Sequence, residues 1–211
     1  MLVAGGFAAL LGRPPVAEVP AWSVEGFLGS AWQAQTGLLI RQNGEPDIMV
    51  EEAKYKTMPF EEAPYYAGRV GRWKRDAAWE FEVVHHKLQL TNKPPEVQLF
   101  NVSHGYNFLF VNRAWALPGF MWRLGCGAVI AHPETEIRNR RRDRGRGYLG
   151  FETAGIGAQI GGGTRVWIAG PLYATIETTL TAGAARVSVA GGHADVANLA
   201  LHGRFGLGGA F

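Results

Sequence analysis

The chain has 211 residues, of which 29 are glycine, 11% are aromatic and only 18% are charged. This length predicts a single domain, and so small a charged fraction is unusual for the surface of a soluble protein. The net charge is +3 and much of the basic excess lies in residues 138–146, so composition does not indicate nucleic-acid binding.

The first twenty residues differ from the rest of the chain. Residues 1–11 are small and apolar, and Gly12, Arg13, Pro14 and Pro15 follow. Such a segment fits the hydrophobic part of a secretory signal that lacks its basic start, or a periplasmic leader. We therefore expect residues 1–20 to precede the folded domain and residues 21–211 to form it.

From Trp22 onward, apolar residues recur with a period of two over segments of ten to fourteen residues. No apolar stretch reaches 18 residues, so any crossing of a membrane must use strands. We expect eight strands, at 22–33, 65–73, 77–90, 97–112, 120–132, 148–160, 165–180 and 198–211. Residues 49–58 also alternate, and either add strands, for a total of ten, or extend the first hairpin above the membrane. The predicted fold is an all-β, antiparallel transmembrane β-barrel.

The last predicted strand has the clearest two-faced pattern. Its apolar residues share one face: Leu199, Leu201, Phe205, Leu207 and Phe211. A strand of this kind that ends on an aromatic residue resembles the C-terminal signal of bacterial outer-membrane barrels, and residues 22–211 are similar in pattern to the small OmpA and OmpX type. The resemblance implies a monomer in the bacterial outer membrane, inserted by the barrel assembly machinery and surrounded by lipids and lipopolysaccharide. A soluble lipocalin-like barrel reverses the two faces.

An even number of strands puts both ends of the barrel domain in the periplasm. The short connections 74–76, 113–119 and 161–164 then become periplasmic turns, and the longer ones, 34–64, 91–96, 133–147 and 181–197, become external loops. The inward face is predicted to mix acids, bases and other polar groups: Glu80, Glu82, His86, Asn101, Ser103, Asn107, Arg123, Glu152, Tyr173, Thr175, Glu177, Arg186, Ser188, His202 and Arg204. Because side chains fill an eight-stranded barrel, this set predicts a sealed plug.

Three histidines fall on the predicted lipid-facing side of consecutive strands: His85, His104 and His132. A histidine that faces hydrocarbon is unfavourable unless it has a partner or lies at headgroup level. Ordinary interfacial residues and a lipid-facing site both explain the pattern. The predicted site adds Tyr106 and Glu134, which lie nearby in the sequence.

A basic run follows these residues, made of Arg138, Arg140, Arg141, Arg142, Arg144 and Arg146. The candidates for substrate binding are its first four members, Arg138, Arg140, Arg141 and Arg142. Arginines in an external loop are suited to binding the phosphates of lipopolysaccharide through charge-assisted hydrogen bonds. A solvated, charged loop explains the same run equally well.

Four segments are similar to barrels that modify lipid A, notably lipid A oxidase-like proteins: residues 85–88, 94–97, 103–107 and 131–134. The resemblance covers the middle third of the chain. It implies metal-dependent oxidation of the lipid A sugar, with His85, His104 and either Glu134 or His132 as ligands of non-haem iron or another divalent metal. The implied catalytic residues are His85, His104, Tyr106, His132 and Glu134.

Other lipid A enzymes fit less well. A deacylase barrel needs a serine and a histidine on one face of a strand, whereas Ser103 and His104 are adjacent and point to opposite faces. A palmitoyltransferase-like barrel finds only a loose match in Ser188, His193 and Asp195. Two function classes remain: an enzyme that acts on lipopolysaccharide, and a non-catalytic barrel for envelope integrity, adhesion or binding.

Overall fold

The computed structural model describes residues 22–61, 63–143 and 150–211, without the side chains of Ser103, His104 and Asp143. The predicted leader, residues 1–20, lies outside these ranges. The strands are β1 (Trp22–Gln33), β2 (Thr36–Gln42), β3 (Ile48–Ala53), β4 (Tyr55–Lys56), β5 (Tyr66–Lys74), β6 (Ala77–Leu90), β7 (Val97–Leu117), β8 (Phe120–Ala131), β9 (Glu134–Ile137), β10 (Arg140–Asp143), β11 (Glu152–Ala169), β12 (Leu172–Val189) and β13 (Gly192–Ala210). In the described part of the chain, no helix is long and apolar enough to cross a membrane.

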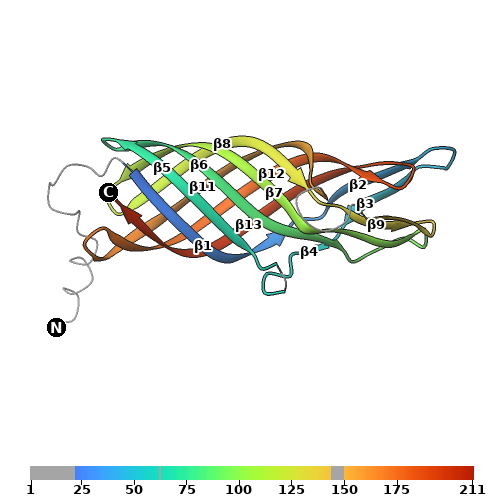
Figure 1. The fold of residues 1–211 in the computed structure, drawn as a ribbon, viewed down its shortest axis with the longest axis horizontal. Coiled ribbons are helices and arrows are strands. Elements are labelled where there is room, and N and C mark those ends of the chain that lie inside the picture. The colour runs from blue at the N-terminus through green and yellow to red at the C-terminus, as the bar shows by residue number, and fades with distance from the viewer. Residues whose placement is uncertain (1–21, 62, 144–149) are drawn as a thin grey trace.

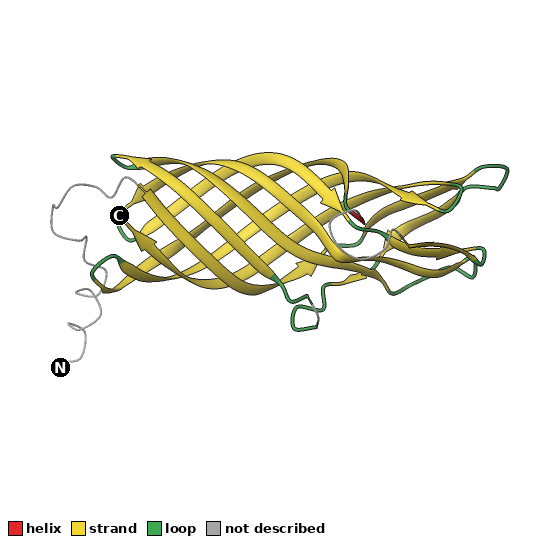
Figure 2. Ribbon diagram, in the orientation of Figure 1, coloured by secondary structure: helices red, strands yellow, loops and turns green. Residues whose placement is uncertain are grey.

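Eight of these strands close into an antiparallel barrel, in the order β1-β5-β6-β7-β8-β11-β12-β13 and back to β1 (Figures 1 and 2). The predicted eight-stranded barrel is therefore confirmed. The outer face of its wall is apolar, with side chains such as Phe81, Leu124, Ile176 and Phe205 more than half exposed. A belt of this kind is stable only against hydrocarbon, so the barrel spans a bilayer.

The strands continue beyond the barrel at the end opposite the C-terminus (Figure 1). There the hairpin of β2 and β3 pairs with β13, the hairpin of β9 and β10 pairs with β7, and β4 pairs with β6. Residues 49–58 thus extend the first hairpin above the membrane, which was one of the two predicted alternatives. We call this part, made of β2, β3, β4, β9, β10 and the ends of β6, β7, β12 and β13, the extension.

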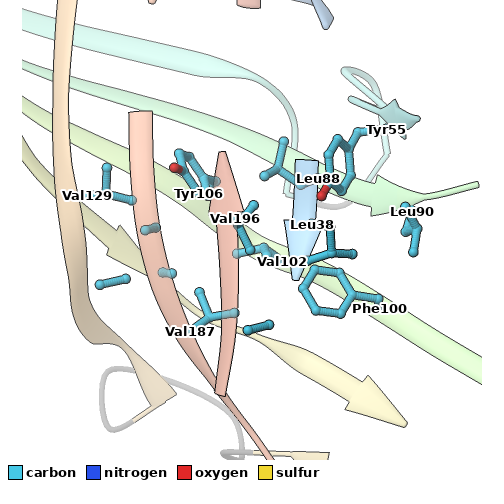
Figure 3. Packing of buried hydrophobic residues seen from close by; sticks show 14 of the residues in the cluster. Leu38, Tyr55, Leu88, Leu90, Phe100, Val102, Tyr106, Val129, Val187 and Val196 are labelled. Carbon is cyan, nitrogen blue, oxygen red and sulfur yellow. The ribbon is translucent and has the colours of Figure 1, made fainter. Parts of the chain in front are cut away.

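The extension has an apolar core of its own (Figure 3). Leu38, Leu88, Phe100, Val102 and Val187 are among its members, and each is at most 1% exposed. They come from strands that lie far apart in the sequence. Burial of these side chains holds the extension together as an ordered β-structure rather than as a set of loops.

Two predicted connections are wrong. Residues 161–164 are not a turn but lie in the middle of β11, and the turn to β12 is at residues 170–171. The glycine-rich stretch instead lets neighbouring side chains and strands approach closely: a Cβ at Gly157 would clash with Phe108, and one at Gly163 with the backbone of Ile176. The predicted loop 181–197 consists of β12 and β13, joined by a tight turn at residues 190–191.

Candidate functional site

The part of the barrel lumen nearer the C-terminal end is filled by charged side chains. These are Glu25, Arg69, Glu80, Glu82, Arg123, Glu177 and Arg204, and each is at most 4% exposed. We call this set the lumen network. The sequence predicted all its members except Glu25 and Arg69, although both alternate with exposed apolar neighbours and so carry the same signal.

Glu177 is the centre of the lumen network. Its carboxylate accepts a hydrogen bond of 3.0 Å from Arg69 Nη2 and further bonds from Arg123 and Arg204. Each of these arginines also contacts a second carboxylate. Arg69 Nε lies 2.6 Å from Glu25, Arg123 Nε lies 2.9 Å from Glu80, and Arg204 Nη1 lies 2.6 Å from Glu82; these pairings compensate the charges in a low-dielectric interior.

Neutral groups occupy further acceptor positions of the carboxylates. The Tyr173 hydroxyl donates to Glu25 at 2.9 Å, while the side-chain amides of Asn112 and Gln159 donate to Glu82 at 2.7 and 2.9 Å. Arg165 adds a fourth guanidinium at the edge of the network, 2.7 Å from Glu25. Opposite charges packed this closely seal the lumen, as expected for a barrel of eight strands.

Towards the extension the lumen becomes aromatic. The ring of His86 stacks on Phe108 and lies 5.2 Å from the ring of His202. Both nitrogens of His202 are hydrogen-bonded, to the hydroxyls of Tyr65 at 3.0 Å and of Thr181 at 2.8 Å. The lumen therefore passes from a charged half into an apolar half that continues into the core of the extension.

Of the predicted site residues, His85 lies on the outer face of β6. Its ring stacks on Tyr66, with 4.8 Å between ring centroids, and its Nδ1 lies 2.7 Å from the side-chain oxygen of Asn107. These neighbours leave His85 only 3% exposed. The prediction that Asn107 points inward is wrong, because Asn107 shares the outer face with His85.

Tyr106 and His132 do not face lipid, in contrast to the prediction. Tyr106 is fully buried and packs inside the barrel against His86 and Phe108. His132, also fully buried, follows the end of β8 and lies 5.1 Å from the ring of Phe151. For Tyr106 the error has a physical cause: β7 is apolar on both faces, so alternation alone did not show which face points outward.

The described members of the predicted metal site are not brought together. His85 pairs with Asn107 of β7, whereas Glu134 pairs with Asn101 of the same strand. Asn101 also pairs with Gln89 of β6, four residues from His85. At about 3.3 Å per residue, His85 and Glu134 are therefore roughly 13 Å apart along the strands, with β7 between them, which is beyond the reach of one metal ion. The side chain of His104 lies outside the described residues. Among the residues that are described, no three His, Cys, Asp or Glu side chains form a group that could hold a metal.

The predicted phosphate-binding arginines lie in the hairpin of β9 and β10. Arg138 donates to the side chain of Gln42 at 2.9 Å and to the backbone oxygen of Pro46 at 2.8 Å, and Arg140 lies 2.7 Å from Glu45. These two arginines join the two hairpins of the extension. Arg141 is exposed and Arg142 partly buried. Arg144 and Arg146 lie outside the described residues.

A shallow groove of about 580 Å³ lies on the outer face of the extension, above the lipid-facing belt. Its lining includes Gly37, Leu39, Ala184, Arg186 and Asp195. Arg186 was predicted to point inward, but its side chain is outside and 2.7 Å from Asp195. The hydrogen bond from Arg186 is the main reason that the pKa of Asp195 is lowered.

Ser188, His193 and Asp195, the residues that loosely match a palmitoyltransferase, do not form a catalytic triad. The Ser188 hydroxyl donates to Glu152 at 2.8 Å, and Asp195 is occupied by Arg186 and Arg41. Ser188 and Glu152 were both predicted to point into the lumen. They instead bond to each other on the outer side of β12, where Glu152 also accepts from the backbone N–H of Ser188.

No protein-family model and no curated protein matches the chain. Solved structures match at low sequence identity. The solid-state NMR structure of the outer membrane protein AlkL in DMPC bilayers is 7% identical, with 95% of this chain and 94% of that chain covered and a TM-score of 0.51. The crystal structure of Neisserial surface protein A is 9% identical over 92% and 100%, with a TM-score of 0.46. Ail of Yersinia pestis is 8% identical over 88% and 99%, with a TM-score of 0.40.

The likeness to AlkL shows that the chain has the fold of an outer-membrane β-barrel. The apolar belt adds an independent reason to place the protein in the bacterial outer membrane. Short turns of such barrels lie in the periplasm, so the extension lies outside the cell.

Proposed function

We propose that this protein is a sealed, non-catalytic outer-membrane barrel that displays an ordered β-module for adhesion or binding at the cell surface. The observation that carries the proposal is the contrast between the two ends of the molecule. The lumen network closes the end nearer the periplasm, while the strands continue outward around a separate apolar core.

A sealed lumen argues against a role as a pore. Glu177 alone connects arginines from three strands, and opening a path would separate buried charges from their partners. Such separation costs several kcal/mol for each pair, roughly 3 to 5. The barrel is therefore a rigid support rather than a channel.

The extension is larger than crossing the membrane requires. A tilted strand crosses a bilayer with about 9 to 11 residues, whereas β7, β12 and β13 have 21, 18 and 19 residues. The surplus residues form the extension, and Arg138 and Arg140 tie its two hairpins together. An ordered surface of this kind is suited to binding because little conformational entropy is lost when a partner docks.

The first test is conductance. Folded full-length protein in planar lipid bilayers is expected to give no stepwise current. Attachment of cells that express the protein to polystyrene and to collagen-coated wells then tests the surface role, with Phe100→Ala as a variant that loosens the extension. Stable single-channel currents would contradict the proposal. So would attachment that is the same for cells with the wild type, cells with the variant and cells without the protein.

A second candidate function, oxidation of lipid A, rests on one observation: His85 lies on the outer wall beneath Tyr66, on the side of the barrel nearer the extension. It is tested by mass spectrometry of lipid A from cells that express the wild type, His85→Ala or the control His193→Ala. A gain of one oxygen that only His85→Ala abolishes supports an enzyme. Unchanged lipid A in all three strains supports the non-catalytic barrel.

A further inference from the structure

Two arginines lie among tryptophans on the outside of the barrel, near its periplasmic turns. Trp22 of β1 pairs with Arg72 of β5, Arg72 pairs with Trp79 of β6, and Trp79 pairs with Arg113 of β7. These four residues form one row across four neighbouring strands, which we call the Trp–Arg row. All four face outward, since the residues next to them along the strands, such as Glu80, point into the lumen.

Each guanidinium of the row packs on an indole. Arg72 Cζ lies 5.4 Å from the ring centroid of Trp22. Arg113 Cζ lies 5.3 Å from that of Trp79 and 5.9 Å from that of Trp115, which is two residues further along β7 toward the periplasmic turn. Contacts of this kind hold the guanidinium by its face and leave its N–H groups at the edge free to bind an anion.

The two arginines have no carboxylate partner among the residues that the structure describes. The three arginines of the lumen network, in contrast, each contact at least two glutamates. An uncompensated guanidinium beside hydrocarbon is costly unless its charge reaches the headgroup level, where it can meet a phosphate. The bilayer itself must therefore supply the anion for Arg72 and Arg113.

An apolar strip lies directly above the Trp–Arg row. It consists of Val24, Val70, Phe81 and Val111, which pair with one another in the same strand order. All four are between 42% and 52% exposed. A lipid whose phosphate lies at the arginines would place its acyl chains along this strip.

We propose that the Trp–Arg row binds the phosphodiester group of a glycerophospholipid in the periplasmic leaflet. Arg72 and Arg113 each donate charge-assisted hydrogen bonds to the free oxygens of such a group, and the indoles hold the guanidiniums at headgroup depth. The two arginine backbones are two strands apart, or about 10 Å, with Trp79 between them. Arg72 packs on Trp22 and Arg113 on Trp79, so each guanidinium meets a headgroup at its own place along the row. The site lies on the opposite side of the membrane from the extension and is independent of the proposed surface role.

Native mass spectrometry of the full chain, folded in detergent micelles with added phosphatidylglycerol, tests this site. The wild type is expected to retain the lipid. Arg72→Gln/Arg113→Gln is expected to bind it at least about tenfold more weakly, because each lost charge-assisted bond contributes on the order of one factor of ten. The matched control is Arg41→Gln/Arg186→Gln, which removes two outward arginines from the extension and should retain the lipid as the wild type does.

The change in electrophoretic mobility on heating shows whether each variant is folded. If the double variant does not fold, the single variants Arg72→Gln and Arg113→Gln replace it, each with a several-fold loss expected. Equal lipid retention by the wild type and by the row variants overturns the proposal, as does an equal loss in the extension control. Displacement of the lipid by millimolar inorganic phosphate also overturns it, because the site would then bind free phosphate.

Discussion

At the scale of single residues, Glu177 has the largest role in the barrel interior. One carboxylate compensates guanidiniums from β5, β8 and β13, so its loss would leave three buried positive charges short of a partner. Breaking a buried ion pair by removing one partner is strongly destabilising, whereas loss of an exposed charge has little effect.

Glu177→Gln is therefore expected to lower the free energy of unfolding by about 3 to 5 kcal/mol. Urea unfolding of the protein in lipid vesicles measures this quantity. Glu51→Gln, at an exposed position of β3, is the control and should unfold like the wild type. Identical midpoints for all three proteins would show that the lumen network does not stabilise the barrel.

Asp195 offers a test of electrostatics outside the membrane. Its pKa is lowered mainly by the hydrogen bond from Arg186, with Arg41 on its other side. A lowered pKa in the folded state means that the interaction stabilises the fold above the unfolded value of about 3.9. This stabilisation is lost as the pH falls through the lower, folded pKa.

Arg186→Gln is expected to raise the pKa of Asp195 toward its ordinary value. Titration of the Asp195 carboxyl carbon by NMR in both proteins measures the shift directly. Ser188→Ala, which leaves Arg186 in place, is the control. A pKa that is the same with and without Arg186 would mean that the pair does not persist in solution.

At the scale of elements, the sequence assigned the inward and outward faces of strands whose two faces differ, and failed to do so where both faces are apolar. The bounds of β1 and β6 are as predicted, because exposed apolar residues alternate there with polar lumen residues. In β7 both faces are apolar: Val111 faces lipid while Phe108 and Phe110 fill the upper lumen. Hydrophobicity could not assign the two faces of β7. For this reason Tyr106 was wrongly predicted to face lipid.

The extension could not be predicted in full for a related reason. The predicted external loops contain short strands, and the core they form joins residues such as Leu38 and Phe100, whose contact depends on the paths of two separate hairpins. Local alternation gave evidence only for residues 49–58. A sequence pattern reports which residues can share a face, but not which face a distant segment will cover.

Phe100→Ala is expected to loosen the extension and leave the barrel folded. Phe100 is fully buried, and its truncation leaves a cavity that costs about 3 to 5 kcal/mol locally. Hydrogen exchange should become faster at the amides of β2, β3 and β9, while the amides of β11 and β12 within the barrel stay protected. Met49→Ala, on the exposed face of β3, should change neither set. Faster exchange throughout the barrel after Phe100→Ala would show that the two parts unfold as one unit.

At the scale of the whole molecule, two interiors of different chemistry are stacked along one set of strands. The interior within the membrane is charged and its outside is apolar; in the extension the inside is apolar. Apolar residues change sides along β12 and β13, with Ile176 facing lipid and Val187 facing the core. The overall alternation was predictable from the sequence, but the height at which it reverses depends on where the bilayer ends.

The orientation of the molecule is tested by cysteine labelling in a Cys126→Ala background. Asn43→Cys lies in the turn between β2 and β3, and Lys74→Cys lies at the opposite end of the barrel. A maleimide that cannot cross the outer membrane should label only Asn43→Cys in intact cells, and both sites after lysis. Labelling of Lys74→Cys alone in intact cells would invert the assignment of the two sides.

The lumen network also sets a condition on how the barrel is assembled. Glu25 and Arg69 come from strands near the N-terminus, whereas Glu177 and Arg204 come from the last two strands. The charges from the two ends of the chain meet only when β1 pairs with β13, the step that closes the ring. Before that step an open sheet would carry ionised groups that need water, so lipid cannot fill its concave side. Glu25 already pairs with Arg69, and Glu177 with Arg204, across neighbouring strands. The contacts between these two pairs form only on ring closure, so a half-assembled sheet has to stay hydrated until its first and last strands meet.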